Sequence, residues 1–177
     1  MSVAEVSRDR VEERLVALEE AYSGFPINQT TLAVPSDAYE RANRRCERGI
    51  VDAYVQLYND SEDVLLVEHD GEWVVPHGEP GPGERIVPGT EAAVREATGV
   101  ACSLTDLTRV TILGVRDEDD PDRPPVYRLV AVFVAETEGD ESAGDVPTLR
   151  AADDGDGSGP DDVRWHPTLP ESAVPSH

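Results

Sequence analysis

The run YRLVAVFVAETE at residues 127–138 restricts the fold more than any other part of this sequence, because seven apolar residues follow one another inside it. A strand that is apolar on both sides suits the middle of a sheet that is covered on both faces. TRVTILGVRDE (108–118) precedes it and reads as a second strand, with the polar turn DDPDRPP between the two. IVDAYVQLYN (50–59) alternates with period two and predicts another strand.

Two further strands are expected between residues 62 and 76. EDVLLVEH (62–69) follows the turn residues Asn59-Asp60-Ser61, and EWVVP (72–76) follows Asp70-Gly71. Asp-Gly is a dipeptide that favours a tight hairpin, so these two segments are expected to be antiparallel neighbours. A short strand and a helical turn are expected in DDVRWHPTLPESAV (161–174).

Helices are expected at the start of the chain. Residues 3–21 place aliphatic side chains at helical spacings among Glu and Arg, which is typical of an amphipathic helix. A loop with Gly24, Pro26 and Asn28 follows. A second helix then begins at Pro35-Ser36, with Ser36 as the expected N-cap and Gly49 as the end.

Strands mixed with a few helices predict an α+β protein in which a mixed sheet is packed between helices, an α/β/α sandwich. We expect residues 1–49 to form an N-terminal helical extension and residues 50–177 to form the main domain. Residues 139–162 are rich in Gly, Asp and Ser and have few large apolar groups, so they predict a mobile acidic loop.

The charge of the chain limits its partners. It has 37 acidic residues and 15 basic ones, a net charge of −22, and every basic residue is arginine. Such acidity without lysine indicates an extremely halophilic source, where concentrated salt screens repulsion between carboxylates. It argues against a broad nucleic-acid-binding surface, which needs a basic face. No apolar run is long enough to span a membrane, and no signal peptide is recognised, so the sequence predicts a cytoplasmic protein.

A basic stripe stands out against this acidity. Arginines recur at helical spacing within the second predicted helix, at Arg41, Arg44, Arg45 and Arg48. Cations are favourable in the last turns of a helix, where Glu40 and Glu47 lie close enough in sequence to pair with them. A surface that faces phosphate or a partner is the alternative interpretation.

The segment GEWVVPHGEPGPGERIVPGTEAAVREATGV (71–100) resembles the signature of the Nudix hydrolases. That family's box reads G-x5-E-x7-R-E-U-x-E-E-x-G-U, where U is aliphatic, and a W-x-x-P-G-G strand commonly precedes it. Here WVVPHG (73–78) leads into Gly78-x5-Glu84, and Gly99-Val100 falls at the closing spacing. The resemblance runs from about residue 50 to 174 and implies the Nudix fold.

The box is degenerate, and two registers remain open. Without a gap, the consensus Arg-Glu falls on Ala92-Ala93 and the Glu-Glu on Glu96-Ala97. With a longer loop and a shorter helix, Arg95-Glu96 becomes the Arg-Glu pair and the Glu-Glu pair is missing. The second register is preferred at this point, because Pro88-Gly89 is expected to disrupt an early helix start and Thr90 suits an N-cap.

The resemblance implies a divalent metal, Mg²⁺ or Mn²⁺, and assigns roles to particular residues. The implied catalytic residues are Glu96 and Arg95, with Arg95 supporting the loop by pairing with Glu91 or Glu84. The implied metal ligands are Glu96, Glu84 and Glu91, and the implied substrate contacts are Gly78, Gly81 and His77. Glu91 and Glu96 are five residues apart, so they cannot share one helix face. Glu136 and Glu138 are further candidate carboxylates.

Two functions follow from these residues. The first is a metal-dependent hydrolase that cleaves the pyrophosphate bond of nucleoside diphosphate derivatives. The second is a catalytically impaired nucleotide-binding or regulatory protein on the same fold. The test between them is whether Glu84, Glu96 and a third acid converge on one point, as a hard cation requires. A nucleotide-type small molecule is the expected ligand in both, and a strand-rich domain with this extension is also compatible with a homodimer.

Overall fold

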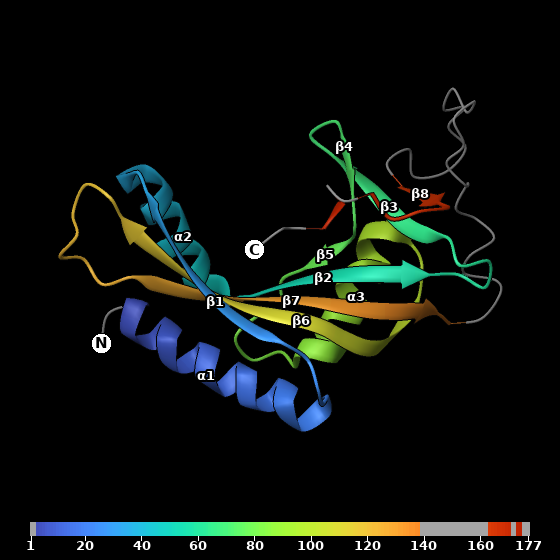
Figure 1. Ribbon diagram of the computed structural model, residues 1–177, viewed down its shortest axis with the longest axis horizontal. Helices are drawn as coiled ribbons and strands as arrows, with labels where there is room; N and C mark the ends of the chain where they lie inside the picture. The colour runs from blue at the N-terminus through green and yellow to red at the C-terminus, as the bar shows by residue number, and fades with distance from the viewer. Residues whose placement is uncertain (1–2, 139–162, 171–172, 175–177) are drawn as a thin grey trace.

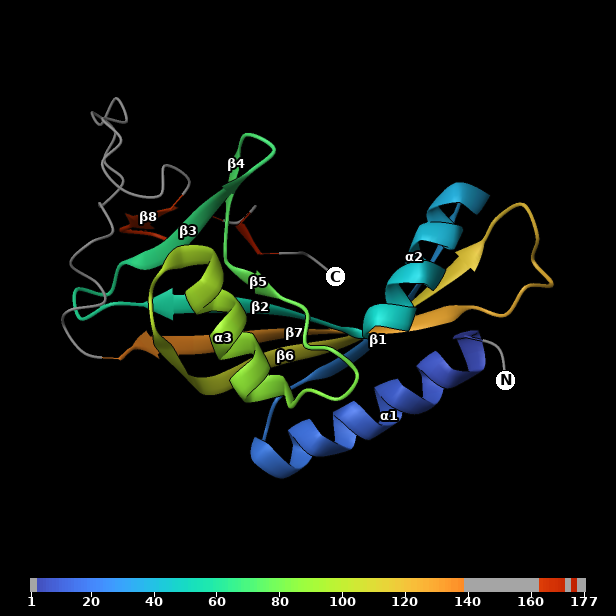
Figure 2. The same ribbon diagram turned by 180° about the vertical axis from the view of Figure 1, so that it is seen from behind.

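The computed structural model describes residues 3–138, 163–170 and 173–174, and the predicted loop 139–162 lies outside that part of the chain. The described helices are α1 (Val3–Ala21), α2 (Ser36–Arg48) and α3 (Ile86–Thr98). The described strands are β1 (Ile27–Val34), β2 (Val51–Tyr58), β3 (Val64–His69), β4 (Glu72–Val74), β5 (His77–Gly78), β6 (Cys102–Asp117), β7 (Val126–Thr137) and β8 (Val163–His166). Figures 1 and 2 show them from opposite sides.

The strands form one mixed sheet in the order β1-β6-β7-β2-β3-β4, in which β5 also pairs with β2 and β8 with β3. The pairs β1–β6 and β2–β7 are parallel, whereas β6–β7 and β2–β3 are antiparallel. The apolar run predicted to be central is β7, between β6 and β2, and Leu129 and Phe133 are fully buried within it. The α+β class with a mixed sheet is therefore confirmed.

Helices cover both faces of the sheet. On one face, Val11 and Leu18 of α1 pack with Phe133, and Val94 of α3 packs with Val55. The opposite face carries Asp52 and Arg128, which α2 covers, because Arg45 and Cys46 of that helix contact these two side chains. Figure 1 shows α1 and α2 on opposite sides of the sheet. The predicted packing of the sheet between helices is therefore confirmed.

A hairpin and two helices were predicted correctly. Asp70 and Gly71 both have positive φ, as a tight two-residue turn requires, and they join His69 to its partner Glu72. The helix predicted at residues 3–21 is α1. Helix α2 ends at Gly49 as predicted, and the position requires glycine because a Cβ there would lie 2.7 Å from the Pro80 carbonyl oxygen.

The loop expected after residue 24 is wrong, because residues 27–34 form strand β1. This strand pairs in parallel with the far end of β6, so the segment 1–49 contributes to the same sheet as the rest of the chain. The N-cap assignment of Ser36 is also wrong. Pro35 occupies the cap position, and the Ser36 hydroxyl instead donates to Asp117 Oδ1 at 2.8 Å.

None of the helices in the described part of the chain combines the length and apolar character needed to cross a membrane.

Candidate functional site

Helix α3, which carries two of the predicted metal ligands, begins earlier than expected. Helix α3 starts at Ile86 with Arg85 as its N-cap residue, and the Gly89 amide donates to the Arg85 carbonyl at 3.0 Å. Pro88 is the third helical residue, where its missing N–H would have had no partner within the helix. The expectation that Pro88-Gly89 blocks an early start, with Thr90 as the cap, is therefore wrong.

This early start suits the register without a gap. In that register the aliphatic and glycine positions of the box fall on Val94, Gly99 and Val100. Val94 and Val100 are fully buried, and Gly99 ends α3 in the left-handed conformation at φ 77°. The consensus acids then fall on Ala93, Glu96 and Ala97, so the helix retains one of them.

The three candidate metal ligands lie in different surroundings. Glu91 accepts a hydrogen bond from the Leu104 amide at 2.9 Å and so links α3 to β6. The Glu84 carboxylate turns back onto its own loop, where it accepts from the Gly81 amide at 3.2 Å. Glu96 is exposed on α3. Among the described residues these carboxylates do not form a group within metal-binding distance.

Arg95 is exposed and forms no ion pair with Glu91 or Glu84 among the contacts of the described residues. The loop is held from elsewhere. Arg14 of α1 donates to the carbonyl oxygens of Glu84 at 2.7 Å, Gly81 at 2.8 Å and Pro82 at 3.3 Å. The first helix therefore supplies the arginine support that the resemblance assigned to Arg95.

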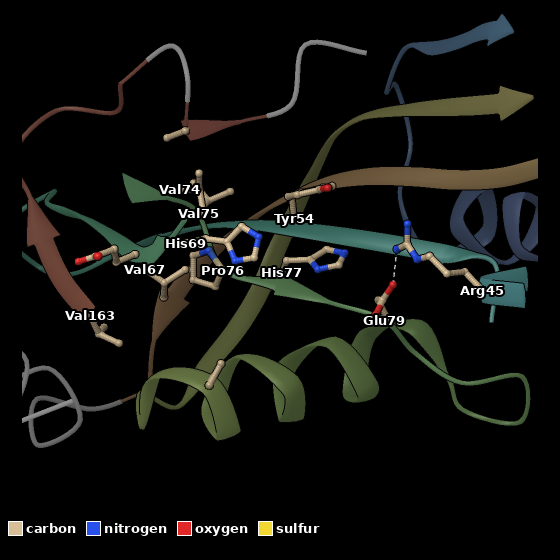
Figure 3. A pocket seen from close by; sticks show the side chains of 13 residues that line it. Arg45, Tyr54, Val67, His69, Val74, Val75, Pro76, His77, Glu79 and Val163 are labelled. Carbon is tan, nitrogen blue, oxygen red and sulfur yellow. Dashed lines mark hydrogen bonds and ion pairs between the residues drawn. The ribbon is translucent and has the colours of Figure 1, made fainter. Parts of the chain in front are cut away.

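A pocket of about 740 Å³ opens beside β5, and it includes some of the predicted residues. His77 projects into it next to Tyr54, and the two rings lie 4.7 Å apart at an angle of 31° (Figure 3). Arg45 and Glu79 form an ion pair at the same end of the pocket. Ala97 of α3 also lines it, whereas Gly78 is buried in β5 against α3.

Asp52 is the centre of a buried ion-pair network beneath this pocket. Arg128 Nε donates to Asp52 Oδ2 at 2.7 Å and Arg128 Nη2 donates to Oδ1 at 3.0 Å, so both oxygens are already paired. Arg45 Nη2 at 2.7 Å and His77 Nε2 at 3.2 Å add two further donors to Oδ1. Arg128 and Asp52 have side chains only 3% and 8% exposed.

This network fixes the ionisation of its central acid. Burial raises the pKa of Asp52, but hydrogen bonds from His77 and Arg128 and the charges of Arg128 and Arg45 outweigh burial and hold that pKa well below its ordinary value. Burial, followed by the negative charge of Asp52, raises the pKa of Tyr54. At neutral pH the pocket therefore presents a neutral phenol and a buried carboxylate whose charge is compensated.

The residues present do not fit the divalent metal that the resemblance implies. Asp52, His77 and Glu79 are the one group of three potential ligands close enough together among the described residues. Arg128 and Arg45 already neutralise Asp52, and Arg45 also pairs with Glu79, so a cation would have to displace two arginines. Glu96, the consensus acid that α3 retains, is not part of this group.

Sequence reasoning missed Asp52, Glu79 and Arg128 as parts of the site. One signal was available. Arg128 stands directly before the apolar run of β7, and a charged side chain beside such a buried segment needs an opposite charge nearby. Asp52 lies in the neighbouring buried strand. Of the arginine stripe, Arg45 reaches the pocket, where it pairs with Asp52 and Glu79 and not with the expected Glu40 or Glu47.

Comparisons with known proteins give partial similarities. No family model matches the chain, and no curated protein matches it. Similar solved structures include the MutT protein of Methanosarcina mazei Go1, with 20% identity and a TM-score of 0.39 over 53% of this chain and 68% of that one. A UDP-X diphosphatase shows 16% identity and a TM-score of 0.38, over 60% of this chain and 52% of that one. The pyrophosphohydrolase BsRppH of Bacillus subtilis shows 20% identity and a TM-score of 0.38, over 68% of this chain and 65% of that one. None of these similarities assigns the chain to a family.

Proposed function

We propose that the protein binds a nucleotide-type small molecule in the pocket beside β5 and does so without a divalent metal. The observation that carries this proposal is the surplus of donors on Asp52. Arg128 alone neutralises and orients that carboxylate, so Arg45 and His77 can turn to an anionic group of a ligand, and Arg45 then gives up its bonds to Asp52 and Glu79. Both line the pocket and both are partly exposed.

The other properties of the pocket support the same class of ligand. A volume of about 740 Å³ falls within the usual range for small-molecule sites. The paired rings of Tyr54 and His77 offer an aromatic surface for a base, while Arg45 offers a bidentate donor for phosphate. The resemblance to Nudix hydrolases, whose substrates are nucleoside diphosphate derivatives, is in line with this chemistry.

Metal-dependent hydrolysis of such derivatives is the second candidate. The Gly78-x5-Glu84 spacing and the retained Glu96 favour it. The dispersal of Glu84, Glu91 and Glu96, together with alanine at three consensus positions of α3, favours binding alone. The expected localisation in the cytoplasm and the halophilic source are part of the same proposal.

Isothermal titration with ADP-ribose, dinucleoside polyphosphates and nucleoside triphosphates tests both candidates. It is carried out in multimolar KCl, with EDTA in one series and Mg²⁺ or Mn²⁺ in the other. Under the binding proposal, one ligand class binds in EDTA, and Arg45→Met and His77→Phe each weaken its affinity about tenfold or more, as loss of a charged hydrogen bond implies. Arg44→Met, a neighbouring exposed arginine on α2, serves as the matched control.

Turnover is measured on the same panel. Metal-dependent cleavage that disappears in Glu96→Gln would establish the hydrolase and overturn the binding proposal. Absence of both binding and cleavage from folded protein would reject both candidates. Binding that is unchanged in Arg45→Met and His77→Phe would place the ligand outside this pocket.

A further inference from the structure

The two edge strands of the sheet, β1 and β4, differ in length and charge, and this difference bears on assembly. At one end, β4 has three residues and includes Glu72, so this edge is short and charged. At the other end, β1 has eight residues, INQTTLAV, with no charge and no proline. Soluble proteins usually protect a long edge strand with charged residues, proline or a bulge, because its free backbone groups can pair with another chain.

The outward-facing backbone groups of β1 can be identified. The carbonyl oxygens of Pro26 and Val34 accept hydrogen bonds from the Val110 and Glu118 amides, so these even-numbered residues face β6. The backbone groups of successive residues point to alternate sides of a strand. The residues whose N–H and C=O groups point away from the sheet are therefore Ile27, Gln29, Thr31 and Ala33.

Charge makes this edge unusual within the molecule. Residues 21–36 contain no acidic or basic side chain, although the chain as a whole carries a net charge of −22. Six of the eight β1 residues are exposed, and among them Ile27 and Leu32 are large apolar side chains with 45% and 40% exposure. A second copy can approach this edge with little of the carboxylate repulsion that it would meet at a typical acidic surface.

We propose that two copies of the chain pair through β1, antiparallel about a two-fold axis, to form one continuous sheet. The register that uses all four outward-facing residues places Gln29 opposite Thr31 of the partner subunit and Ile27 opposite Ala33 of the partner subunit. Thr30 then lies on the axis, opposite Thr30 of the partner subunit. A two-fold interface of this kind is self-complementary, as expected of a homodimer.

Light scattering coupled to size-exclusion chromatography in multimolar KCl measures the consequence. The native protein is expected to have twice the mass of one chain. Gln29→Pro removes an outward N–H and leaves the β1–β6 ladder intact, and Leu32→Glu adds a charge, so both are expected to reduce the mass to one chain. Val16→Glu is the matched control, because Val16 of α1 is 55% exposed and lies outside the strand; it is expected to remain dimeric.

A cross-link tests the register independently of any loss of folding. Antiparallel residues in a pair without mutual hydrogen bonds have Cα atoms about 4.5 Å apart, within the range that a disulfide spans. Thr30→Cys is therefore expected to form a covalent dimer under mild oxidation, whereas Val16→Cys is expected to form no covalent dimer. Cys46 and Cys102 are buried and do not compete. A monomeric native protein, or a dimer in which Thr30→Cys fails to cross-link, would overturn the proposal.

Discussion

Removal of Arg128 is expected to cause a large loss of stability, because it leaves a carboxylate buried with weaker compensation. Arg128→Met keeps much of the side-chain volume but removes both bonds to Asp52 and the bond from Nη1 to the Gly49 carbonyl at 3.0 Å. Loss of one partner from a buried ion pair costs about 3–5 kcal/mol. Arg45 and His77, which are more exposed, compensate Asp52 only in part.

The size of this effect makes it measurable by thermal denaturation. For a chain of this length, each kcal/mol shifts the unfolding midpoint by roughly 2–4 °C, so a decrease of about 6–20 °C is expected. Arg41→Met is the matched control, because its partner Asp37 is also exposed and such surface pairs contribute about 1 kcal/mol or less. The double variant Asp52→Asn/Arg128→Met is expected to recover part of the loss, because the buried charge is then removed.

The pH dependence supplies a second check. The pKa of Asp52 is lowered in the folded state, so its stabilising contribution is present above the unfolded-state pKa of about 3.9 and is lost as pH falls below it. The stability difference between the native protein and Arg128→Met is therefore expected to narrow below about pH 4. A difference under 1 kcal/mol at neutral pH, or strict additivity in the double variant, would refute the reasoning.

Three further predictions concern the loop and helix α3. Arg14→Met removes three bonds to the loop at residues 81–84, and amide hydrogen exchange in that loop is expected to accelerate while exchange in the central strands is unchanged. Glu91→Ala leaves the Leu104 amide without its acceptor and is expected to lower the free energy of unfolding by about 1–3 kcal/mol, measured by denaturant titration, with no change in ligand affinity. Gly99→Ala places a side chain at φ 77° and is expected to cost about 1 kcal/mol by the same titration, although a Cβ there meets no atom within 4 Å.

Much of the sheet could be predicted because its strongest signals are local. The apolar run of β7 is suited to a buried strand. Asp70-Gly71 predicts a tight hairpin turn because both residues readily adopt positive φ. Strand β1 could not be predicted in this way. Its sequence neither alternates nor forms an apolar run, and it becomes a strand because β6 offers an unpaired edge.

The candidate site was predicted less completely, because its geometry depends on tertiary contacts. Nothing near Glu91 in sequence indicates that its carboxylate accepts from the Leu104 amide. The start of α3 was misjudged because Pro88 was treated as an interior helix residue, whereas it lies in the first turn. His77 was predicted to contact a ligand and it lines the pocket, but its partner Asp52 comes from another strand.

The parallel pairing of β1 with β6 has a consequence for the order of events during synthesis. Ile27 pairs with Val110, which is 110 − 27 = 83 residues later in the chain. At roughly 5–20 residues per second, a ribosome needs about 4 to 17 s to make that interval. During this time β1 has emerged without the strand that completes it, and so has β2, whose parallel neighbour β7 is made later still. The nascent chain can therefore form the antiparallel β2–β3 and β3–β4 pairs early, whereas the parallel pairs of β1 with β6 and of β2 with β7 form only after the later strands are made.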